Sequence, residues 1–182
     1  MTTRVLIADD NAKVREAWQR LLLTIPNVEV VAVASDGEEA VSLAMHYRPS
    51  VVLIPVDDDG RLILVRQYRA PLDRHTWEFP AGSVAPGEFV EAAAARECEE
   101  EIGLVPGRLE HLGSWYPVPG YCDEQMIFFR LSQLRPPAPD SPHKPDEDEE
   151  IETKTLSIDE ARAMANRGEI VDLKTAFALT FL

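Results

Sequence analysis

The sequence has few basic residues, few cysteines and no long apolar run, and each shortage excludes a class of protein. Only 18 Lys and Arg stand against 32 Asp and Glu, which gives a formal net charge of −14. Nucleic-acid binding is not expected, because contact with phosphates needs a basic surface that releases counterions. No stretch approaches the roughly 20 apolar residues that cross a bilayer, so no membrane span is expected.

The cysteines and the first residues indicate a reducing compartment. Cys98 and Cys122 are the only two cysteines, and their spacing fits neither a zinc site nor a disulfide framework, so both are expected to be free thiols. The opening MTTRVLIADD carries acidic residues where a secretory signal needs an apolar core. We therefore expect a cytoplasmic protein.

Two different patterns divide the chain near residue 50. The first part alternates short apolar runs with helical periodicity, in a β-α-β-α-β order that predicts parallel strands joined by crossover helices. The predicted strands are RVLIA, EVVAVA and VVLI, and the predicted helices cover residues 14–23 and 37–46. With 45% hydrophobic residues, the 182-residue chain can form one large or two small domains.

The second part favours antiparallel strands and capped helices. VVLIPV and RLILVRQYR flank Asp57–Gly60, whose Asp-Gly step favours a hairpin turn. Gly103 closes a helix predicted from Phe89 to Ile102, and Ser157 with Glu160 has capping-box spacing. Further strands are predicted at 76–82, 109–116, 125–131 and 151–156, and a last helix from Asp172.

Three glutamates on the predicted 89–102 helix have the spacing of a cation site. Glu97, Glu100 and Glu101 stand at i, i+3 and i+4, which places three carboxylates on one helix face. A divalent cation relieves their repulsion, and oxygen ligands suit Mg²⁺ or Mn²⁺. Arg96 can brace a carboxylate, and a backbone carbonyl near Ala81 can add a ligand. A run of glutamates by itself is more often a solvent-exposed helix face. A cation site is therefore expected here only because of the wider sequence pattern.

That pattern extends from Gly82 to Leu104 and resembles the Nudix box. The box reads G-x5-E-x7-R-E-U-x-E-E-x-G-U, where U is apolar, and the chain fits every position, with the small thiol Cys98 at the first apolar place. The resemblance covers about residues 51–182. It implies an α/β class Nudix fold, an α/β/α sandwich with a mixed sheet, in which the box helix binds Mg²⁺ and water attacks a pyrophosphate phosphorus.

Motifs outside the box resemble the ADP-ribose pyrophosphatase branch of that superfamily. These are RQYR at 66–69, WEFPAG at 77–82, PVPGYCDE with Pro119 15 residues past the box, and PDEDEEIE from Pro145. The resemblance implies hydrolysis of ADP-ribose, or a related nucleoside diphosphate sugar, to AMP and ribose 5-phosphate. A homodimer is also expected.

The resemblance assigns roles to individual residues. The implied metal ligands are Ala81 through its carbonyl, Glu97, Glu100 and Glu101, and Glu101 is also assigned to catalysis. The base in this branch is a loop glutamate, for which Glu149 is the first candidate, followed by Glu147 and Glu124. The candidate substrate contacts are Arg66, Arg69, Glu78, Pro119 and Tyr121.

Several of these assignments have a simpler alternative. Arg69 is as consistent with a strand-end salt bridge as with phosphate binding, and Glu78 is a candidate partner for either arginine. Trp77, Trp115 and Tyr121 are candidates to stack on adenine, although a large aromatic on a strand is more often part of the core.

Residues 1–54 resemble the first half of a response-regulator receiver domain, a truncated flavodoxin-like fragment. The match includes the acidic pair Asp9–Asp10, but Pro55 stands where the phosphoacceptor aspartate belongs. Phosphorylation signalling is therefore not expected. We interpret residues 1–50 as a receiver-like fragment and residues 51–182 as the Nudix domain, joined either in a recombined chimera or as a natural extension.

The replaced N-terminus leaves two functions open. In the ADP-ribose branch, N-terminal strands help to build the dimer and part of the substrate pocket. One interpretation is a pyrophosphohydrolase that works without that segment. The alternative is a Nudix-fold binding or scaffold protein whose pocket is impaired.

Overall fold

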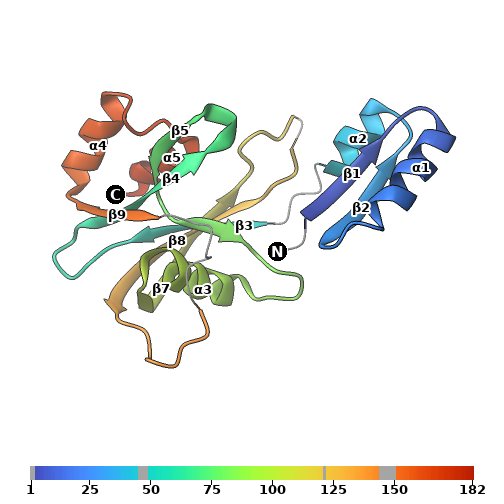
Figure 1. Ribbon diagram of the computed structural model, residues 1–182. Helices are drawn as coiled ribbons and strands as arrows, with labels where there is room; N and C mark the ends of the chain where they lie inside the picture. The colour runs from blue at the N-terminus through green and yellow to red at the C-terminus, as the bar shows by residue number, and fades with distance from the viewer. Residues whose placement is uncertain (1–2, 45–48, 121, 144–150) are drawn as a thin grey trace. The chain divides into compact units, whose positions relative to one another are not determined.

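A computed structural model describes residues 3–44, 49–120, 122–143 and 151–182. The chain forms two compact units (Figure 1). One comprises residues 1–47 together with 118–124, and the other comprises residues 48–117 and 125–182.

The first unit contains two strands and two helices in the predicted order. They are β1 (Thr3–Ala8), α1 (Ala12–Leu22), β2 (Val28–Ala34) and α2 (Gly37–Ala44). β1 and β2 pair in parallel, as the crossover pattern predicts. Asn11 begins α1, because its side chain accepts a hydrogen bond from the Lys13 amide at 3.0 Å.

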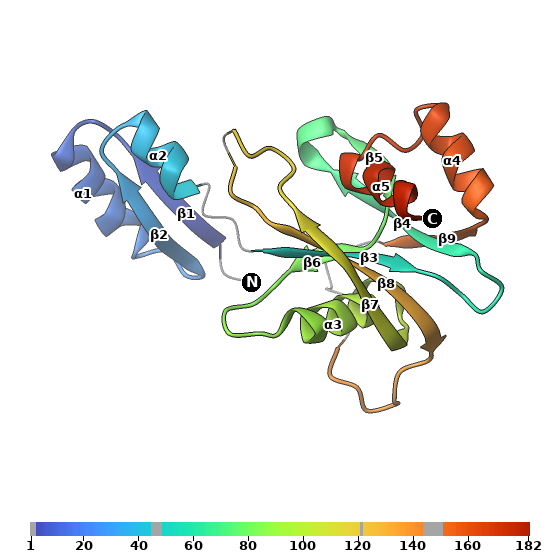
Figure 2. The ribbon, with the colours of Figure 1, turned by 180° about the vertical axis from the view of Figure 1, so that it is seen from behind.

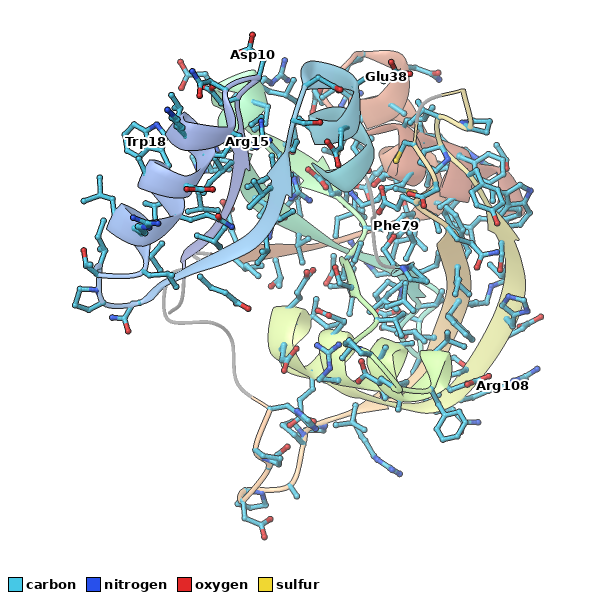
Figure 3. All side chains as sticks on the ribbon, turned by 90° about the vertical axis from the view of Figure 1, so that its right-hand side faces the viewer. Asp10, Arg15, Trp18, Glu38, Phe79 and Arg108 are labelled. Atoms are coloured by element: carbon cyan, nitrogen blue, oxygen red, sulfur yellow. The ribbon has the colours of Figure 1, made fainter. Side chains whose placement is uncertain are left out.

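This unit has a small core. Ile7 and Ala34 are its buried apolar side chains among those described, and none of the residues of α1 is buried. Trp18 on α1 is 51% exposed, and Figure 3 shows it beside Arg15 on the same helix. Two strands and two helices cannot cover one another fully.

The third strand of the β-α-β-α-β pattern, VVLI, lies in the second unit. β3 (Ser50–Pro55) pairs in parallel with β8 (Met126–Arg135) and antiparallel with β6 (Ala81–Ser83), and it has no pairing with β1 or β2. Every residue of β3 is buried. The physical reason is that the elements of the second unit cover both faces of this strand.

The second unit contains two sheets. The first is mixed, in the order β6-β3-β8-β7, and β7 (Val105–Trp115) pairs antiparallel with β8. The second is antiparallel, in the order β5-β4-β9, and consists of β5 (Arg74–Glu78), β4 (Leu62–Arg69) and β9 (Glu152–Leu156). A short 3₁₀ turn, η1 (Ala70–Leu72), joins β4 to β5.

The predicted turn at Asp57–Gly60 forms, but the hairpin does not continue as one ladder. The Gly60 amide donates to the Asp57 carbonyl, and Gly60 adopts a positive φ of 74°. A single bridge links Val56 to Leu62, after which β3 and β4 enter different sheets. The Asp-Gly step therefore predicted the turn, but it did not predict that the two flanking strands enter different sheets.

Helices cover the mixed sheet on both sides, which confirms the predicted α/β/α arrangement. Val51 and Leu53 of β3 pack with α3 (Val90–Ile102), whereas Val52 and Ile54 pack in a second cluster with the other sheet and the C-terminal helices. Figure 2 shows α3 on one side of β3 and β8, and α4 and α5 on the other. These C-terminal elements are α4 (Ile158–Asn166), α5 (Leu173–Ala178) and η2 (Leu179–Phe181).

The predicted helix ends are confirmed. Gly103 ends α3 in the left-handed conformation, with φ 68°. Ser157 and Glu160 form a reciprocal capping box at α4, and Asp172 caps α5 through the Thr175 amide. Of the helices in the described ranges, none has the length and apolar character to cross a membrane.

The large cluster predicts a strong effect of truncating Leu64, which is fully buried in it. We expect Leu64→Ala to lower the free energy of unfolding by about 2–5 kcal/mol, through lost apolar burial and the remaining cavity. Urea unfolding followed by far-UV circular dichroism measures this. Leu72→Ala is the control, because Leu72 is exposed; equal losses in the two variants would contradict the assigned core.

Candidate active site

A polar cavity lies where the start of β6 meets the glutamate face of α3. Its volume is about 330 Å³. β6 carries Ala81 and Gly82 to its wall, α3 supplies the acidic side chains, and β4 supplies Arg69. The lining residues are Gln67, Arg69, Ala81, Gly82, Ser83, Arg96, Glu97, Glu100 and Glu101.

Arg96 holds the acidic side chains together. Its Nη1 donates to Glu97 at 2.8 Å and to Glu100 at 2.7 Å, and its Nε donates to Glu88 at 3.0 Å. These hydrogen bonds to Glu88, Glu97 and Glu100 raise the pKa of the guanidinium, and the contact with Arg96 lowers the pKa of Glu88. The predicted bracing role of Arg96 is confirmed, and it extends to three carboxylates.

Gly82 makes room for one of these carboxylates. A Cβ atom at this position would lie 1.9 Å from the carboxyl carbon of Glu97. Any side chain at Gly82 must therefore displace Glu97 or the β6 backbone. This close approach is the reason for glycine at the first position of the box.

The cavity has the donor chemistry of a divalent-cation site. Glu97, Glu100 and Glu101 line one space and offer only oxygen atoms, which suits a hard cation. The Ala81 amide donates to Glu101 at 3.3 Å, so this carboxylate lies beside the β6 backbone. In the described part of the chain, no three acidic, histidine or cysteine side chains already converge as a ready-made metal cluster. Glu97 and Glu100 are instead paired with Arg96.

A second charged network lies next to the cavity, around Glu78. Arg69 donates to this carboxylate from Nε at 2.8 Å and from Nη2 at 2.6 Å, and Lys174 and Thr76 donate to it as well. Lys174 also lies 3.0 Å from Asp172. Burial by itself raises the pKa of Glu78, but Arg69, Lys174 and Thr76 outweigh burial and hold the pKa at about 2.

Sequence reasoning did not find the environment of two charged residues. Lys174 is 96 residues from Glu78, and no local pattern connects them. Glu99 is buried on α3, and its Oε1 has no hydrogen-bond partner. The sequence alone does not show that Glu99 is covered, because the packing of α3 decides which side of the helix is buried.

The structure separates the other candidate residues. Arg69 pairs with Glu78, as the salt-bridge alternative predicts, and it also lines the cavity. Arg66 pairs with Glu152 of β9 at 3.1 Å and is not among the residues that line the cavity. Pro119 and Glu124 lie in the 118–124 segment grouped with the first unit. Tyr121, Glu147 and Glu149 lie outside the described residues.

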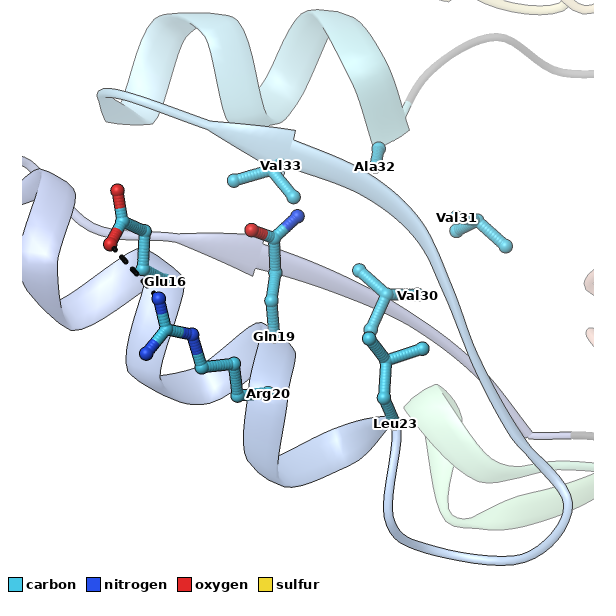
Figure 4. A pocket seen from close by; sticks show the side chains of 8 residues that line it. All are labelled: Glu16, Gln19, Arg20, Leu23, Val30, Val31, Ala32 and Val33. Atoms are coloured by element: carbon cyan, nitrogen blue, oxygen red, sulfur yellow. Dashed lines mark ion pairs between the residues drawn. The ribbon is translucent and has the colours of Figure 1, made fainter.

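The first unit has a hollow of a different kind, between α1 and β2 (Figure 4). Its volume is about 570 Å³, and Leu23, Val30 and Val31 line it. The ion pair drawn there, Glu16 with Arg20 at 3.8 Å, is exposed. An exposed pair beside aliphatic side chains provides no group for catalysis, so the candidate active site lies in the second unit.

Comparison with known proteins agrees with this geometry. Residues 46–174 match the family described as NUDIX domain. The chain belongs to the Nudix hydrolase family. This Nudix hydrolase is 35% identical to an ADP-ribose pyrophosphatase of Bacillus subtilis (strain 168), over 73% of this chain and 71% of the relative. It is 30% identical to a methanol dehydrogenase activator of Bacillus methanolicus, over 81% and 78%.

A solved structure gives the same result for the fold. An ADP compounds hydrolase superposes with a TM-score of 0.65 at 26% identity, covering 73% of this chain and 69% of that chain. The predicted membership of the ADP-ribose pyrophosphatase branch of Nudix enzymes is therefore confirmed. The receiver-like origin of the first unit stays a prediction.

The Glu78 network predicts a pH-dependent contribution to stability. A folded pKa of about 2, below the ordinary 4.5, stabilises the fold above pH 4.5, and this stabilisation is lost as the pH falls toward 2. We expect Glu78→Gln to be less stable than the parent near neutral pH, by on the order of 3 kcal/mol. Urea unfolding at a series of pH values should show this gap closing below pH 4.5. A gap independent of pH would contradict the network, and Glu91→Gln, on an exposed helix position, is the control.

Proposed function

We propose that this Nudix hydrolase cleaves the pyrophosphate bond of ADP-ribose, or of a related nucleoside diphosphate sugar, with Mg²⁺ or Mn²⁺. The products from ADP-ribose are AMP and ribose 5-phosphate. One observation carries the proposal: the carboxylates of α3 and the guanidinium of Arg69 line the same polar cavity. A diphosphate needs this combination of cation ligands and a fixed positive charge.

The oxygen donors of the cavity define where a cation would be held. Glu97, Glu100 and Glu101 would be its carboxylate ligands, and the carbonyl of Ala81 would add a backbone oxygen. A bound cation neutralises charge on the diphosphate and makes a bound water more acidic. Arg96 keeps Glu97 and Glu100 on one side of the helix before any cation binds.

Arg69 is the candidate contact for a phosphate oxygen. Its Nε and Nη2 are used by Glu78, but a guanidinium has five N–H groups, so further donors remain. Glu78 fixes the plane of the group, and the side chain of Glu78 is only 3% exposed. Arg69 would therefore approach the substrate already oriented, with little ordering left to do on binding.

The remaining chemistry is a proton transfer. Water attacks a phosphorus of the diphosphate, the bridging P–O bond breaks, and a loop glutamate takes the proton of the water. Glu149 is the first candidate for this base, with Glu147 and Glu124 behind it. A general base of this kind contributes about 10²- to 10⁴-fold to the rate.

The names of the relatives support the substrate class. One is an ADP-ribose pyrophosphatase, and the solved structure is of an ADP compounds hydrolase. Both names refer to ADP, an adenine nucleotide that carries a diphosphate. The expected homodimer and cytoplasmic location stay predictions.

The first test is AMP release from ADP-ribose in the presence of Mg²⁺. We expect Glu101→Gln to lower kcat on the order of 100-fold or more, because transition-state charge loses its electrostatic stabilisation. Glu91→Gln is the matched control, since it makes the same change on an exposed position of the same helix. Product formation is followed by chromatography at equal concentrations of folded protein.

Two results would contradict this proposal. Retained activity in Glu101→Gln would remove the cation site from the mechanism. A folded parent that binds Mg²⁺ and releases no AMP would instead favour the alternative, a Nudix-fold binding or scaffold protein.

The close approach of Gly82 to Glu97 gives a second prediction. We expect Gly82→Ala to weaken Mg²⁺ binding roughly 10- to 100-fold, because the added methyl group displaces a ligand from its place. Isothermal titration calorimetry measures the affinity. Gly37→Ala is the control, because a methyl group at Gly37 would meet no atom within 4 Å. Unchanged affinity in Gly82→Ala would contradict this prediction.

A further inference from the structure

The first turn of α5 contacts the point where the chain crosses from one sheet to the other. β5 ends at Glu78 in the antiparallel sheet and β6 begins at Ala81 in the mixed sheet, so residues 79–80 make the crossing. Ala81 and Gly82 then line the catalytic cavity. The place of this cavity wall therefore depends on what holds the crossing.

Thr175 of α5 holds the backbone of the crossing. Phe79 is fully buried, and its amide donates to the Thr175 hydroxyl at 2.8 Å. A buried amide needs such an acceptor, because it has no access to water. The same hydroxyl donates to the carboxylate of Asp172 at 2.5 Å, and Thr175 is fully buried as well. The hydroxyl thus both donates and accepts, which fixes its orientation.

Lys174, from the same turn, contacts the carboxylate of Glu78. Each oxygen of this carboxylate accepts two hydrogen bonds: Oε1 from Arg69 Nε and Thr76, and Oε2 from Arg69 Nη2 and Lys174. Arg69 and Thr76 lie on the paired strands β4 and β5, whereas Lys174 comes from α5. Lys174 therefore joins the carboxylate that holds Arg69 to the C-terminal helix.

Lys174 also balances the charge around Arg69. Its Nζ lies 3.0 Å from Asp172 as well as beside Glu78, and its side chain is 8% exposed. The pKa of Arg69 is raised by its hydrogen bonds to Glu78 and by the negative charges of Asp172 and Glu101. Charges interact strongly where little water screens them. By pairing with two of these carboxylates, Lys174 leaves more of the charge of Arg69 for a ligand.

Lys174 lies outside the catalytic cavity. It is not among the described residues that line that cavity. Its side chain instead lines a second hollow, with a volume of about 210 Å³, whose other walls are mainly aromatic and aliphatic side chains from β7, β8 and α5. Because Lys174 and Arg69 both donate to Oε2 of Glu78, this carboxylate connects the lysine to the cavity.

We propose that Lys174 is a positioning residue for diphosphate binding, which orients Glu78 so that the guanidinium of Arg69 is held toward the phosphates of the ligand. The inference rests on the proposed function and adds a residue that needs no contact with the phosphates or the cation. Lys174 positions a side chain of the site, and Thr175 positions its backbone wall. A cation that is oriented in advance leaves little ordering for the binding step.

The test uses the methylene analogue of ADP as a diphosphate probe, because its P–C–P bridge is not hydrolysed. The full chain is titrated with this probe in Mg²⁺ by calorimetry. We expect Lys174→Met to raise the Kd about tenfold, because Arg69 loses its orientation. The KM for ADP-ribose should rise by a similar factor with kcat within about threefold, since the contact to Arg69 binds substrate and transition state alike. Lys13→Met, at an exposed position of α1, is the control.

A double variant separates positioning from a general loss of structure. Glu78→Gln is titrated alone and together with Lys174→Met. If Lys174 acts through Glu78, adding Lys174→Met to Glu78→Gln changes the Kd by less than about twofold, because effects within one network are not additive. Independent effects would multiply. Lys174→Gln, which keeps a hydrogen-bond donor, takes the place of Lys174→Met if that variant does not fold.

The outcomes separate this inference from the proposed function. If the parent hydrolyses ADP-ribose and Lys174→Met leaves the Kd unchanged, or if the two effects multiply, the positioning role is wrong and the function stands. If the parent is inactive but binds the probe, and Lys174→Met weakens binding only while Glu78 is present, the positioning role stands and the function is wrong. A parent that does not bind the probe overturns the positioning role as well.

Discussion

Burial of β3 on both faces is the constraint on which the rest of the structure depends. Val51 and Leu53 face one apolar cluster and Val52 and Ile54 face the other, so a single strand requires a layer of structure on each side. That requirement brings α3 against one face and the second sheet with the C-terminal helices against the other. β3 does not pair with β1 or β2, since two short strands offer no equivalent burial. The first unit is left with a two-stranded sheet and a small core.

The same strand positions the chemistry. β6 pairs with β3 at one edge of the mixed sheet and places Gly82 against Glu97 of α3. The acidic side chains that meet there repel one another. Arg96 reduces this repulsion because it pairs with three of them, Glu88, Glu97 and Glu100. Beside this cavity the charge balance is reversed, because the two cations Arg69 and Lys174 share one buried carboxylate, Glu78. A negative cavity bordered by fixed cations suits a ligand that carries both a metal-binding diphosphate and further anionic oxygens.

The second unit therefore has two hollows of different chemistry. The cavity is polar and offers carboxylate oxygens, whereas the other hollow is lined mainly by aromatic and aliphatic side chains. Residues far apart in the chain meet beside the cavity, where Lys174 donates to Glu78 and the Phe79 amide donates to Thr175. Membership of the Nudix family accounts for the first surface. The second lies against β7, β8 and α5.

The sequence by itself determined the local chemistry of this protein. The i, i+3, i+4 glutamates, the bracing Arg96, the Gly103 helix end and the Ser157 capping box depend on neighbours within a few turns, and all were predictable for that reason. Tertiary structure decided what joins distant segments: the pairing of β3 with β6 and β8, the pairing of Glu78 with Lys174 and the burial of Glu99. Periodicity shows that a strand such as β3 is apolar on both faces, but not which elements cover it. Contacts across 96 residues arise only when whole layers pack, and no local pattern encodes them.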